Sequence, residues 1–325
     1  MQYRYQQSGV TLIELMLAMT IGLIMIGGAI ALFIQSNRSF GENEKISRMQ
    51  DDARFVLGEL SHELANAGFW AELSDAGSVN PDTSLTIATD CGPGTTPWVY
   101  DATTQITALD NATAATATAQ FSCIDGTVVQ PGTDIIGIKR TAGNNSAAPL
   151  DAGAVYVKSN GIVGLLFKDP VAAPPAVAVP APATDWLYVP SIWYVRTHAN
   201  DADSADGIPT MCRKFLDTSG TPSMIEECMA RGVEDLQIEF GVDTDGDGVV
   251  DQYLANPAAA LMPRVIAVRL FLLSRSVDPQ QGYTNGKTYQ LGNRAAVTPN
   301  DNFYRRVYAA TVTTRNLRNQ ARLGF

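Results

Sequence analysis

The sequence predicts an α+β protein in which a long N-terminal helix, transmembrane in its first half, packs on a mostly antiparallel β-sheet head. From Val10 to Ile34 the chain is apolar and carries a single charge, Glu14. Apolar residues then recur with helical spacing as far as Leu64, and strand-like patterns dominate the second half. A helix of residues 10–34, at about 1.5 Å per residue, is long enough to cross the ~30 Å apolar core of a bilayer.

The nine residues before the apolar segment form an unusual leader. In a secretory signal the cleavage site follows the apolar region. Here the polar stretch MQYRYQQSG ends in Gly9 directly before that region. A cut after Gly9 removes residues 1–9, keeps the apolar helix and exposes a new amino terminus at Val10. Glu14 then becomes the fifth residue of the processed chain.

These residues resemble the type IV prepilin signature, which is a glycine and an apolar residue followed by TLIEL at the start of an apolar helix. Gly9, Thr11, Leu12 and Glu14 fall where the family places them. The resemblance implies that a prepilin peptidase cleaves after Gly9 and methylates the amine of Val10. It also implies that Glu14 acts in assembly, because the terminal amine of one subunit can neutralise this carboxylate in its neighbour within an apolar bundle. The alternative is a plain signal anchor with an incidental glutamate.

Residues 35–69 are expected to continue the helix as an amphipathic segment. Their apolar positions follow a three-and-four spacing that draws one stripe along a helix. These positions are Ile46, Met49, Ala53, Val56, Leu57, Leu60 and Leu64. Since no proline occurs before Pro81, one helix from about Thr11 to Ala67 is expected, with its stripe against the globular part of the same chain.

Residues 70–325 are expected to form a β-rich globular head. From Ala71 to Gln120 the composition favours Thr, Ala, Asp, Ser and Gly, which predicts a loop-rich surface with one short strand at Ser84–Thr89. Five further strands are expected between clusters of Gly, Pro and Asn. They are Asp134–Lys139, Ala154–Lys158, Ile162–Phe167, Trp186–Val189 and Ser191–Arg196.

The clearest strand patterns follow Cys228. Leu236–Val242 and Tyr304–Thr314 alternate as half-buried strands do, whereas Arg264–Leu273 is apolar on both faces and is expected to be central. The segments GVEDLQIEFGV, VIAVRLFLLSRS and FYRRVYAATVTTRNL resemble the PilW-type minor pilins. Together with the N-terminal helix, this resemblance covers about half of the chain.

Four cysteines, all after the apolar helix, predict an exported domain with two disulfides. Three connectivities are open. Cys91 with Cys123, and Cys212 with Cys228, close the shortest loops. A zinc site is not expected, because no CxxC occurs and the two histidines, His62 and His198, lie far apart.

The segment DTDGDGVVD has the spacing of a calcium loop. Its acidic residues stand at relative positions 1, 3, 5 and 9, Gly248 stands at position 6, and the carbonyl at position 7 can add a ligand. The expected ligands are Asp243, Asp245, Asp247, Val249 and Asp251. Leu254 occupies position 12, where an EF-hand has a bidentate glutamate, so water or another loop must complete the shell. We therefore expect Ca²⁺ as a cofactor of loop 243–251, with a plain acidic turn as the alternative.

Composition and motifs argue against two classes of function. The formal charge is −10, from 23 basic and 33 acidic residues, and phosphate contact requires basic clusters, so nucleic acid is not an expected partner. No GxSxG, HExxH or phosphate-binding glycine loop followed by lysine occurs. An enzyme is not expected.

The resemblance to pilins implies a structural role. The expected function is that of a minor pilin in the initiating or tip complex of a type IV pilus, involved in pilus biogenesis, adhesion or twitching motility. Ala31 favours a minor subunit, because major pilins have a helix-kinking proline there. Expected partners are other major and minor pilins, the prepilin peptidase and the inner-membrane assembly machinery. The expected location is the bacterial inner membrane, as a single span with the head in the periplasm, and then the pilus at the cell surface. A pseudopilin of a type II secretion system and a calcium-dependent tip adhesin are the alternatives.

Overall fold

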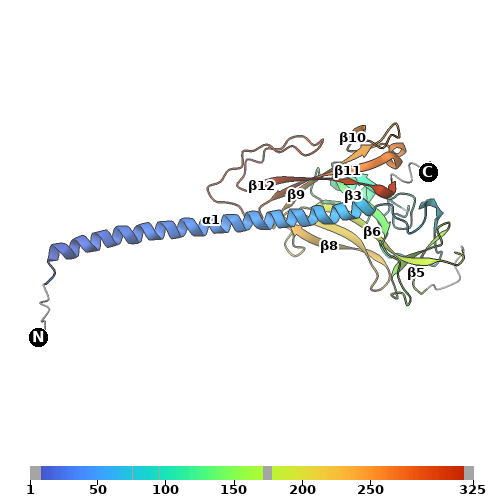
Figure 1. Cartoon of the computed structure of the whole chain (residues 1–325), viewed down its shortest axis with the longest axis horizontal. Helices are drawn as coiled ribbons and strands as arrows, with labels where there is room; N and C mark the ends of the chain where they lie inside the picture. Colours follow the sequence, from blue (N-terminus) through green and yellow to red (C-terminus); the bar gives the residue numbers. More distant parts are fainter. Residues whose placement is uncertain (1–8, 75, 95, 171–177, 318–325) are drawn as a thin grey trace, which may run out of the picture. The chain divides into compact units, whose positions relative to one another are not determined.

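The computed structural model describes residues 9–74, 76–94, 96–170 and 178–317 (Figure 1). The chain divides into two compact units, Met1–Arg48 and Met49–Phe325. One helix, α1 (Leu12–Asn66), contributes its first part to one unit and its last part to the other. The expected helix is confirmed to within a residue at each end, and Gly27 and Gly28 are ordinary helical residues within it.

The head contains two sheets. The eight-stranded sheet has the order β1-β5-β4-β6-β3-β2, and β7 and β8 extend it from β6. Its strands are β1 (Val79–Pro81), β2 (Ile106–Leu109), β3 (Ile135–Thr141), β4 (Val155–Ser159), β5 (Gly164–Lys168), β6 (Thr184–Arg196), β7 (Thr210–Asp217) and β8 (Ser223–Arg231).

The four-stranded sheet has the order β10-β9-β11-β12. Its strands are β9 (Val233–Val242), β10 (Gln252–Leu254), β11 (Val265–Arg275) and β12 (Arg305–Thr313). As the apolar pattern predicts, β11 is central, with β9 and β12 on either side. Among the described residues only β1 and β5 pair in parallel. The expected α+β class with a mostly antiparallel head is therefore confirmed.

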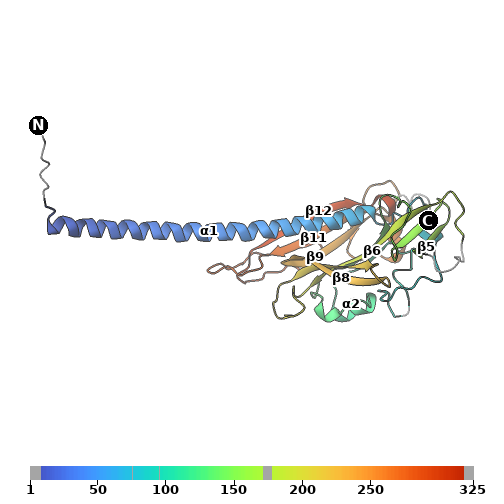
Figure 2. The same ribbon diagram turned by 90° about the horizontal axis from the view of Figure 1, so that it is seen from below.

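The last part of α1, from Met49, lies between the two sheets and forms a core with both (Figures 1 and 2). Ala53, Val56, Leu60 and Leu64 are fully buried, at the spacing that the sequence predicts. They share one cluster with side chains of both sheets, including Ile136, Ile138, Trp193, Leu236, Phe240, Leu270 and Leu272. Burial of one leucine contributes about 1.5–3 kcal/mol, so this end of the helix is a large part of the stability of the head.

A buried ion pair fixes α1 to the eight-stranded sheet. The Glu63 carboxylate accepts two hydrogen bonds, each 2.8 Å long, from the guanidinium of Arg140 in β3. Only 5% of the Glu63 side chain and 11% of the Arg140 side chain are exposed. At this depth, loss of either partner leaves the other charge desolvated and uncompensated.

We expect Glu63→Ala to lower the free energy of unfolding by about 3–5 kcal/mol, the usual cost of breaking a buried pair from one side. Chemical denaturation of the purified chain measures this change. Glu227→Ala is the matched control, because Glu227 pairs with Arg213 at the surface and such pairs contribute about 1 kcal/mol or less. Equal losses for the two variants would contradict the assignment of Glu63 as an anchor.

The opposite face of the eight-stranded sheet is covered by the segment that the sequence predicts to be surface. Loops do dominate Ala71–Gln120, apart from β1, β2 and the short helix α2 (Ala114–Gln120). The prediction of a surface is wrong, however, because Trp98 and many of its neighbours are buried in a second core. Trp70, just before this segment, stacks on Tyr188 of β6 with ring centroids 5.7 Å apart. Isolated apolar side chains on loops follow no period, so patterning cannot assign them to a core.

The short strand predicted at Ser84–Thr89 is absent. Its apolar residues Leu85 and Ile87 are buried, as a strand pattern suggests. Their backbone groups, however, bind the hydroxyl of Tyr100, which donates to the Leu85 carbonyl at 3.0 Å and accepts the Ile87 N–H at 2.7 Å. The Tyr100 hydroxyl binds the backbone groups that a neighbouring strand would otherwise bind. Sequence periodicity cannot predict this contact.

Trp186–Val189 and Ser191–Arg196 are one strand, β6, where the sequence predicts two. The first half of β6 pairs with β4 as far as Leu187, and the second half pairs with β7 from Ser191. Pro190, which has no N–H to donate, lies between these partners. On its other side it faces Lys139, whose N–H bonds to the carbonyl of Gln105 rather than to β6. Pro190 therefore fits within β6 without leaving the N–H group of Lys139 unpaired.

Asp134 joins the two sheets at the start of β3. Its carboxylate accepts the N–H of Asn111 at 2.8 Å and the N–H of Ile238, in β9, at 2.7 Å. Its own N–H donates to the carbonyl of Leu236 at 2.9 Å. Burial raises the pKa of Asp134 to about 7, although the two N–H donors act in the opposite direction.

The raised pKa of Asp134 predicts a pH dependence of stability. The folded chain holds a proton that the unfolded chain releases near pH 4. The stabilisation is therefore complete below about pH 4 and is lost as the pH rises through about 7. Asp134→Asn cannot titrate, so it should flatten the decline of unfolding free energy between these values. Urea unfolding across this range measures the slope, and an unchanged slope would show that another group is responsible.

Candidate functional site

The start of α1 is closed by a capping box. Glu14 Oε2 accepts the Thr11 N–H at 3.2 Å and the Thr11 hydroxyl at 3.1 Å, and Thr11 Oγ1 accepts the Glu14 N–H at 3.4 Å. Such reciprocal bonds satisfy donors that a helix start otherwise leaves unpaired. Oε1 makes no hydrogen bond to the described residues, so the carboxylate can cap its own helix and accept a second donor.

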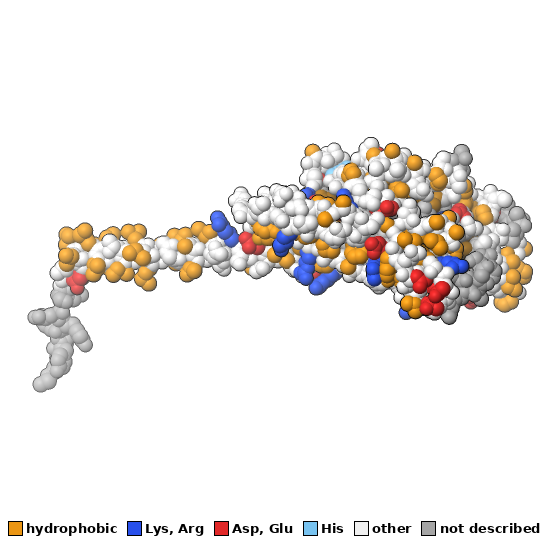
Figure 3. Space-filling view, turned by 90° about the horizontal axis from the view of Figure 1, so that it is seen from above, with side chains coloured by type: hydrophobic (Ala, Val, Ile, Leu, Met, Phe, Trp, Pro, Cys, Tyr) orange, Lys and Arg blue, Asp and Glu red, His pale blue; other side chains and the backbone are white. Residues whose placement is uncertain are grey.

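The first part of α1 presents apolar side chains on every side. Leu12, Ile24 and Leu32 are each more than 70% exposed, and Figure 3 shows the hydrophobic side chains that cover this part of the helix. Within the described residues, α1 is the one helix long and apolar enough to cross a membrane. A helix that is apolar all round needs lipid or other helices around it.

The predicted calcium ligands lie in the loop between β9 and β10. Asp243 Oδ1 accepts the Gly246 N–H at 2.6 Å, and Oδ2 accepts the Gly248 N–H at 2.7 Å. Gly246 and Gly248 have φ of +86° and +88°, a conformation open mainly to glycine. Asp247 Oδ1 accepts the Val249 N–H at 2.7 Å. These bonds hold the Asp243 and Asp247 carboxylates against the backbone of the loop.

The carboxylate spacing fits a calcium ion. One carboxylate oxygen from each of Asp243, Asp245 and Asp247 lies within 4.8 Å of the other two. Two oxygens that both bind Ca²⁺ at about 2.3–2.6 Å are separated by no more than about 5.2 Å. Three acidic side chains held this close repel one another unless a cation neutralises them.

The other two predicted ligands are placed differently. Asp251 is not one of this three-carboxylate group. Its Oδ2 accepts the N–H and hydroxyl of Thr244, which closes the loop and lowers the pKa of Asp251. Val249 is 62% exposed and its N–H binds Asp247. Sequence spacing alone could not separate ligands that converge from an aspartate that closes the loop.

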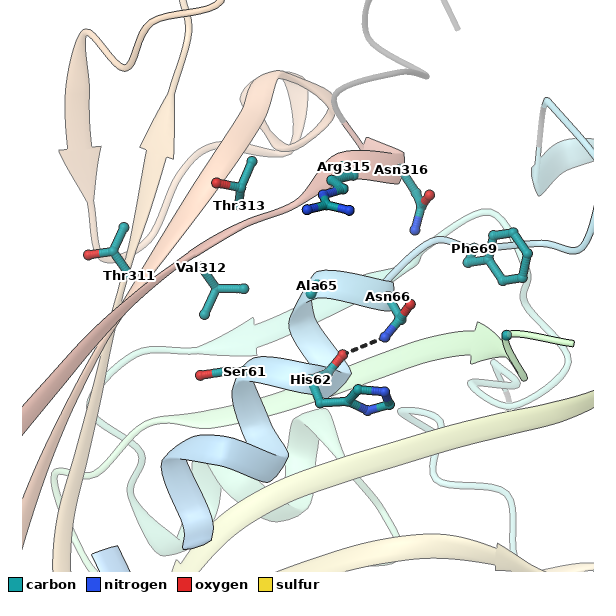
Figure 4. Close-up of a pocket in the computed structure, with 11 residues that line it drawn as sticks. Ser61, His62, Ala65, Asn66, Phe69, Thr311, Val312, Thr313, Arg315 and Asn316 are labelled. Carbon is teal, nitrogen blue, oxygen red and sulfur yellow. Dashed lines mark hydrogen bonds between the residues drawn. The ribbon is translucent and has the colours of Figure 1, made fainter. Parts of the chain in front are cut away.

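Sequence reasoning missed a groove between α1 and β12, which we call the α1–β12 groove. It has a volume of about 750 Å³. Its lining comes from Ser61, His62, Ala65 and Asn66 of α1, from Phe69 and Gly143, and from Thr311, Val312, Thr313, Arg315 and Asn316 (Figure 4). The segments that form it are far apart in the chain, so no local pattern indicates it.

Comparison with known proteins gives two family matches. Residues 192–316 match the family described as type IV pilus-assembly protein W, and residues 4–30 match the prokaryotic N-terminal methylation motif. Together the two matches support a pilin of the PilW type with a prepilin signature. A type IV-like pilin from Thermus thermophilus is similar in structure, with 13% sequence identity and a TM-score of 0.36, over 83% of this chain and 97% of that one. No curated protein sequence matches the chain.

Both disulfides that the sequence predicts are present. Cys91 bonds to Cys123 and Cys212 bonds to Cys228, with Cα atoms 4.7 and 4.0 Å apart. Cys212 and Cys228 stand opposite each other on β7 and β8. This hairpin is not among the elements predicted above, although the Thr-Ser-Gly-Thr-Pro segment midway between the two cysteines is typical of a turn. Because their sulfurs are bonded, these cysteines cannot join Glu226 as metal ligands.

Proposed function

We propose that the chain is a minor pilin of the initiating or tip complex of a type IV pilus, with a part in pilus biogenesis, adhesion or twitching motility. The matches to the PilW family and the methylation motif support the coarser role in pilus assembly. The observation that carries the proposal is the exposed apolar helix, which begins just after Gly9 and has Glu14 as its one charge before Ile34.

The mechanism of assembly follows from charge and solvation. Cleavage after Gly9 by the prepilin peptidase frees a cationic amine at Val10. In an apolar bundle this amine pairs with the Glu14 carboxylate of a neighbouring subunit, because a lone charge there costs several kcal/mol. Glu14 Oε2 remains bound to Thr11, and Oε1 receives the amine. The pair sets the register between adjacent helices.

The proposed path leads from the inner membrane, where α1 is the single span and the head lies in the periplasm, into the pilus. The inner-membrane assembly machinery and the other major and minor pilins are the partners on this path. A type II secretion pseudopilin would use the same helix, so the identity of the co-purifying proteins separates the two. If the chain co-purified with type II secretion components and not with pilus subunits, it would be a pseudopilin of that system.

We expect Glu14→Ala to insert into the membrane but to enter pili at less than about a tenth of the wild-type level, since one partner of a buried pair is missing. Glu14→Gln is the informative companion, because it keeps an oxygen for the Thr11 N–H and loses the charge. If assembly depends on the charge pair with the amine and not on the cap formed with Thr11, both variants should enter pili at the same reduced level. The measurement is immunoblotting of sheared pili and of inner membranes.

Thr20→Ala is the matched control, since Thr20 also lies in the span and its hydroxyl, among the described residues, bonds to the Leu17 carbonyl alone. It should assemble normally. Normal assembly of Glu14→Gln would show that the charge has no role.

We also propose that loop 243–251 binds Ca²⁺ through Asp243, Asp245 and Asp247, with the carbonyl of Val249, Asp251 and water as further candidate ligands. The support is the carboxylate spacing of the three-aspartate group. The ion would tie the β9–β10 turn together and neutralise the local charge.

We expect calcium to stabilise the head by about 2.7 kcal/mol when its free concentration is a hundred times Kd. Magnesium should do less, because it demands near-octahedral geometry and holds its waters. Calorimetry and thermal melting of a metal-free fragment that begins at Asn43 measure both effects.

The double variant Asp245→Asn with Asp247→Asn keeps the side-chain oxygens that accept the Asp247 and Val249 N–H groups. It should lose the calcium response and remain folded without metal. Asp203→Ala, an exposed acidic residue outside the loop, is the control and should respond as wild type does. No heat of binding and no change in melting for wild type would reduce the loop to an acidic turn.

A further inference from the structure

Strand β12 is an edge of the four-stranded sheet. Among the described residues it pairs with β11 alone. Two hydrogen bonds just beyond the ends of β12 show which of its residues bond to β11. The Thr314 N–H donates to the Ile266 carbonyl, and the Ser276 N–H donates to the Tyr304 carbonyl. Opposed residues in an antiparallel pair exchange both bonds or neither, in alternation. The even-numbered residues of β12 therefore bond to β11.

The odd-numbered residues direct their backbone groups away from the sheet. They are Val307, Ala309, Thr311 and Thr313, and their backbones make no hydrogen bond to other described residues. The last three are exposed and have small side chains. Figure 4 shows Val312 pointing toward α1, with Thr311 and Thr313 pointing away from it. The outer edge of the strand is thus open to another backbone.

This edge lacks the usual protection. Natural sheets shield edge strands with charges, prolines or bulges. Residues 307–313, VYAATVT, contain no charge and no proline, and the register with β11 is unbroken. An uncharged segment of high β-propensity with a free edge tends to pair with another strand.

The α1–β12 groove runs beside this edge, and its lining contains the cationic side chain of Arg315 and no acidic side chain. His62 and Arg315 are the two ionisable residues of its lining, in a chain of formal charge −10. The Arg315 guanidinium has no hydrogen bond or ion pair with a described residue. The chain's own residues 318–325 carry Arg318 and Arg322 and no acidic residue, so charge disfavours them as occupants. Charge favours an acidic partner.

We propose that an extended acidic segment of a different protein pairs with β12 in the α1–β12 groove, as a fifth strand of the four-stranded sheet. Its backbone bonds to the outward groups of Ala309, Thr311 and Thr313, and a carboxylate meets Arg315. The inference goes beyond the proposed function and does not depend on it, since it concerns the head and requires no fibre.

The test is photo-crosslinking in cells of the native host, with the full chain at its natural level and p-benzoylphenylalanine in place of Ala309. Thr311→Pro removes one outward N–H and leaves the β11 ladder intact, and it should lower the crosslink yield about five- to tenfold, as loss of one hydrogen bond implies. Thr311→Val keeps the N–H and should crosslink normally. Arg315→Glu reverses the charge at the surface and should lower the yield without affecting folding, which circular dichroism of each variant checks.

The inference is supported if mass spectrometry finds the probe on an Asp- or Glu-rich segment of another protein and if both Thr311→Pro and Arg315→Glu reduce that product. A crosslink to residues 318–325, or to a second copy of this chain, overturns it. A product that survives both variants overturns it as well, and so does the absence of any crosslink.

Discussion

The position of α1 between two sheets is the constraint on which the head depends. The stripe from Ala53 to Leu64 is buried by side chains of both sheets, and Glu63 pairs with Arg140 on β3. Exposure of this stripe to water would cost several kcal/mol. The helix is therefore the shared core of both sheets, and the same continuous helix begins at Leu12 with the assembly signature.

The two parts of α1 differ in what surrounds them, and the sequence encodes the difference. Before Ile34 the apolar side chains point in every direction and are exposed, so they require surroundings supplied by lipid or neighbouring helices. From Met49 most of the large apolar side chains lie on one face, which the head itself covers, and Phe55 is exposed. Glu14 belongs to the first part and Glu63 to the second, and in each case a carboxylate in apolar surroundings calls for a cation.

Features set by local periodicity could be predicted from the sequence, and features set by a single distant contact could not. The helix, the β9, β11 and β12 strands and the disulfide pairs follow from spacing along the chain. The segment Ser84–Thr89 has the pattern of a strand, but the Tyr100 hydroxyl binds its backbone groups instead of a neighbouring strand. Pro190 predicts a break between two strands, but β6 continues through it because the pairing with β4 ends before Pro190 and the pairing with β7 begins after it. In the acidic loop, spacing correctly brings three aspartates together. Spacing does not distinguish Asp251, which lies outside this group, from the three aspartates. The α1–β12 groove could not be predicted, because its lining comes from segments far apart in the chain.

The proposed assembly requires that processing of α1 leave Val10 as the new amino terminus, so that Glu14 is the fifth residue of the mature chain. Mass spectrometry of the amino terminus of the chain, purified from membranes and pili of its host, tests this directly. We expect a mature chain that begins at Val10 with a methylated amine. A chain that begins at Met1, or after the apolar segment, would contradict it.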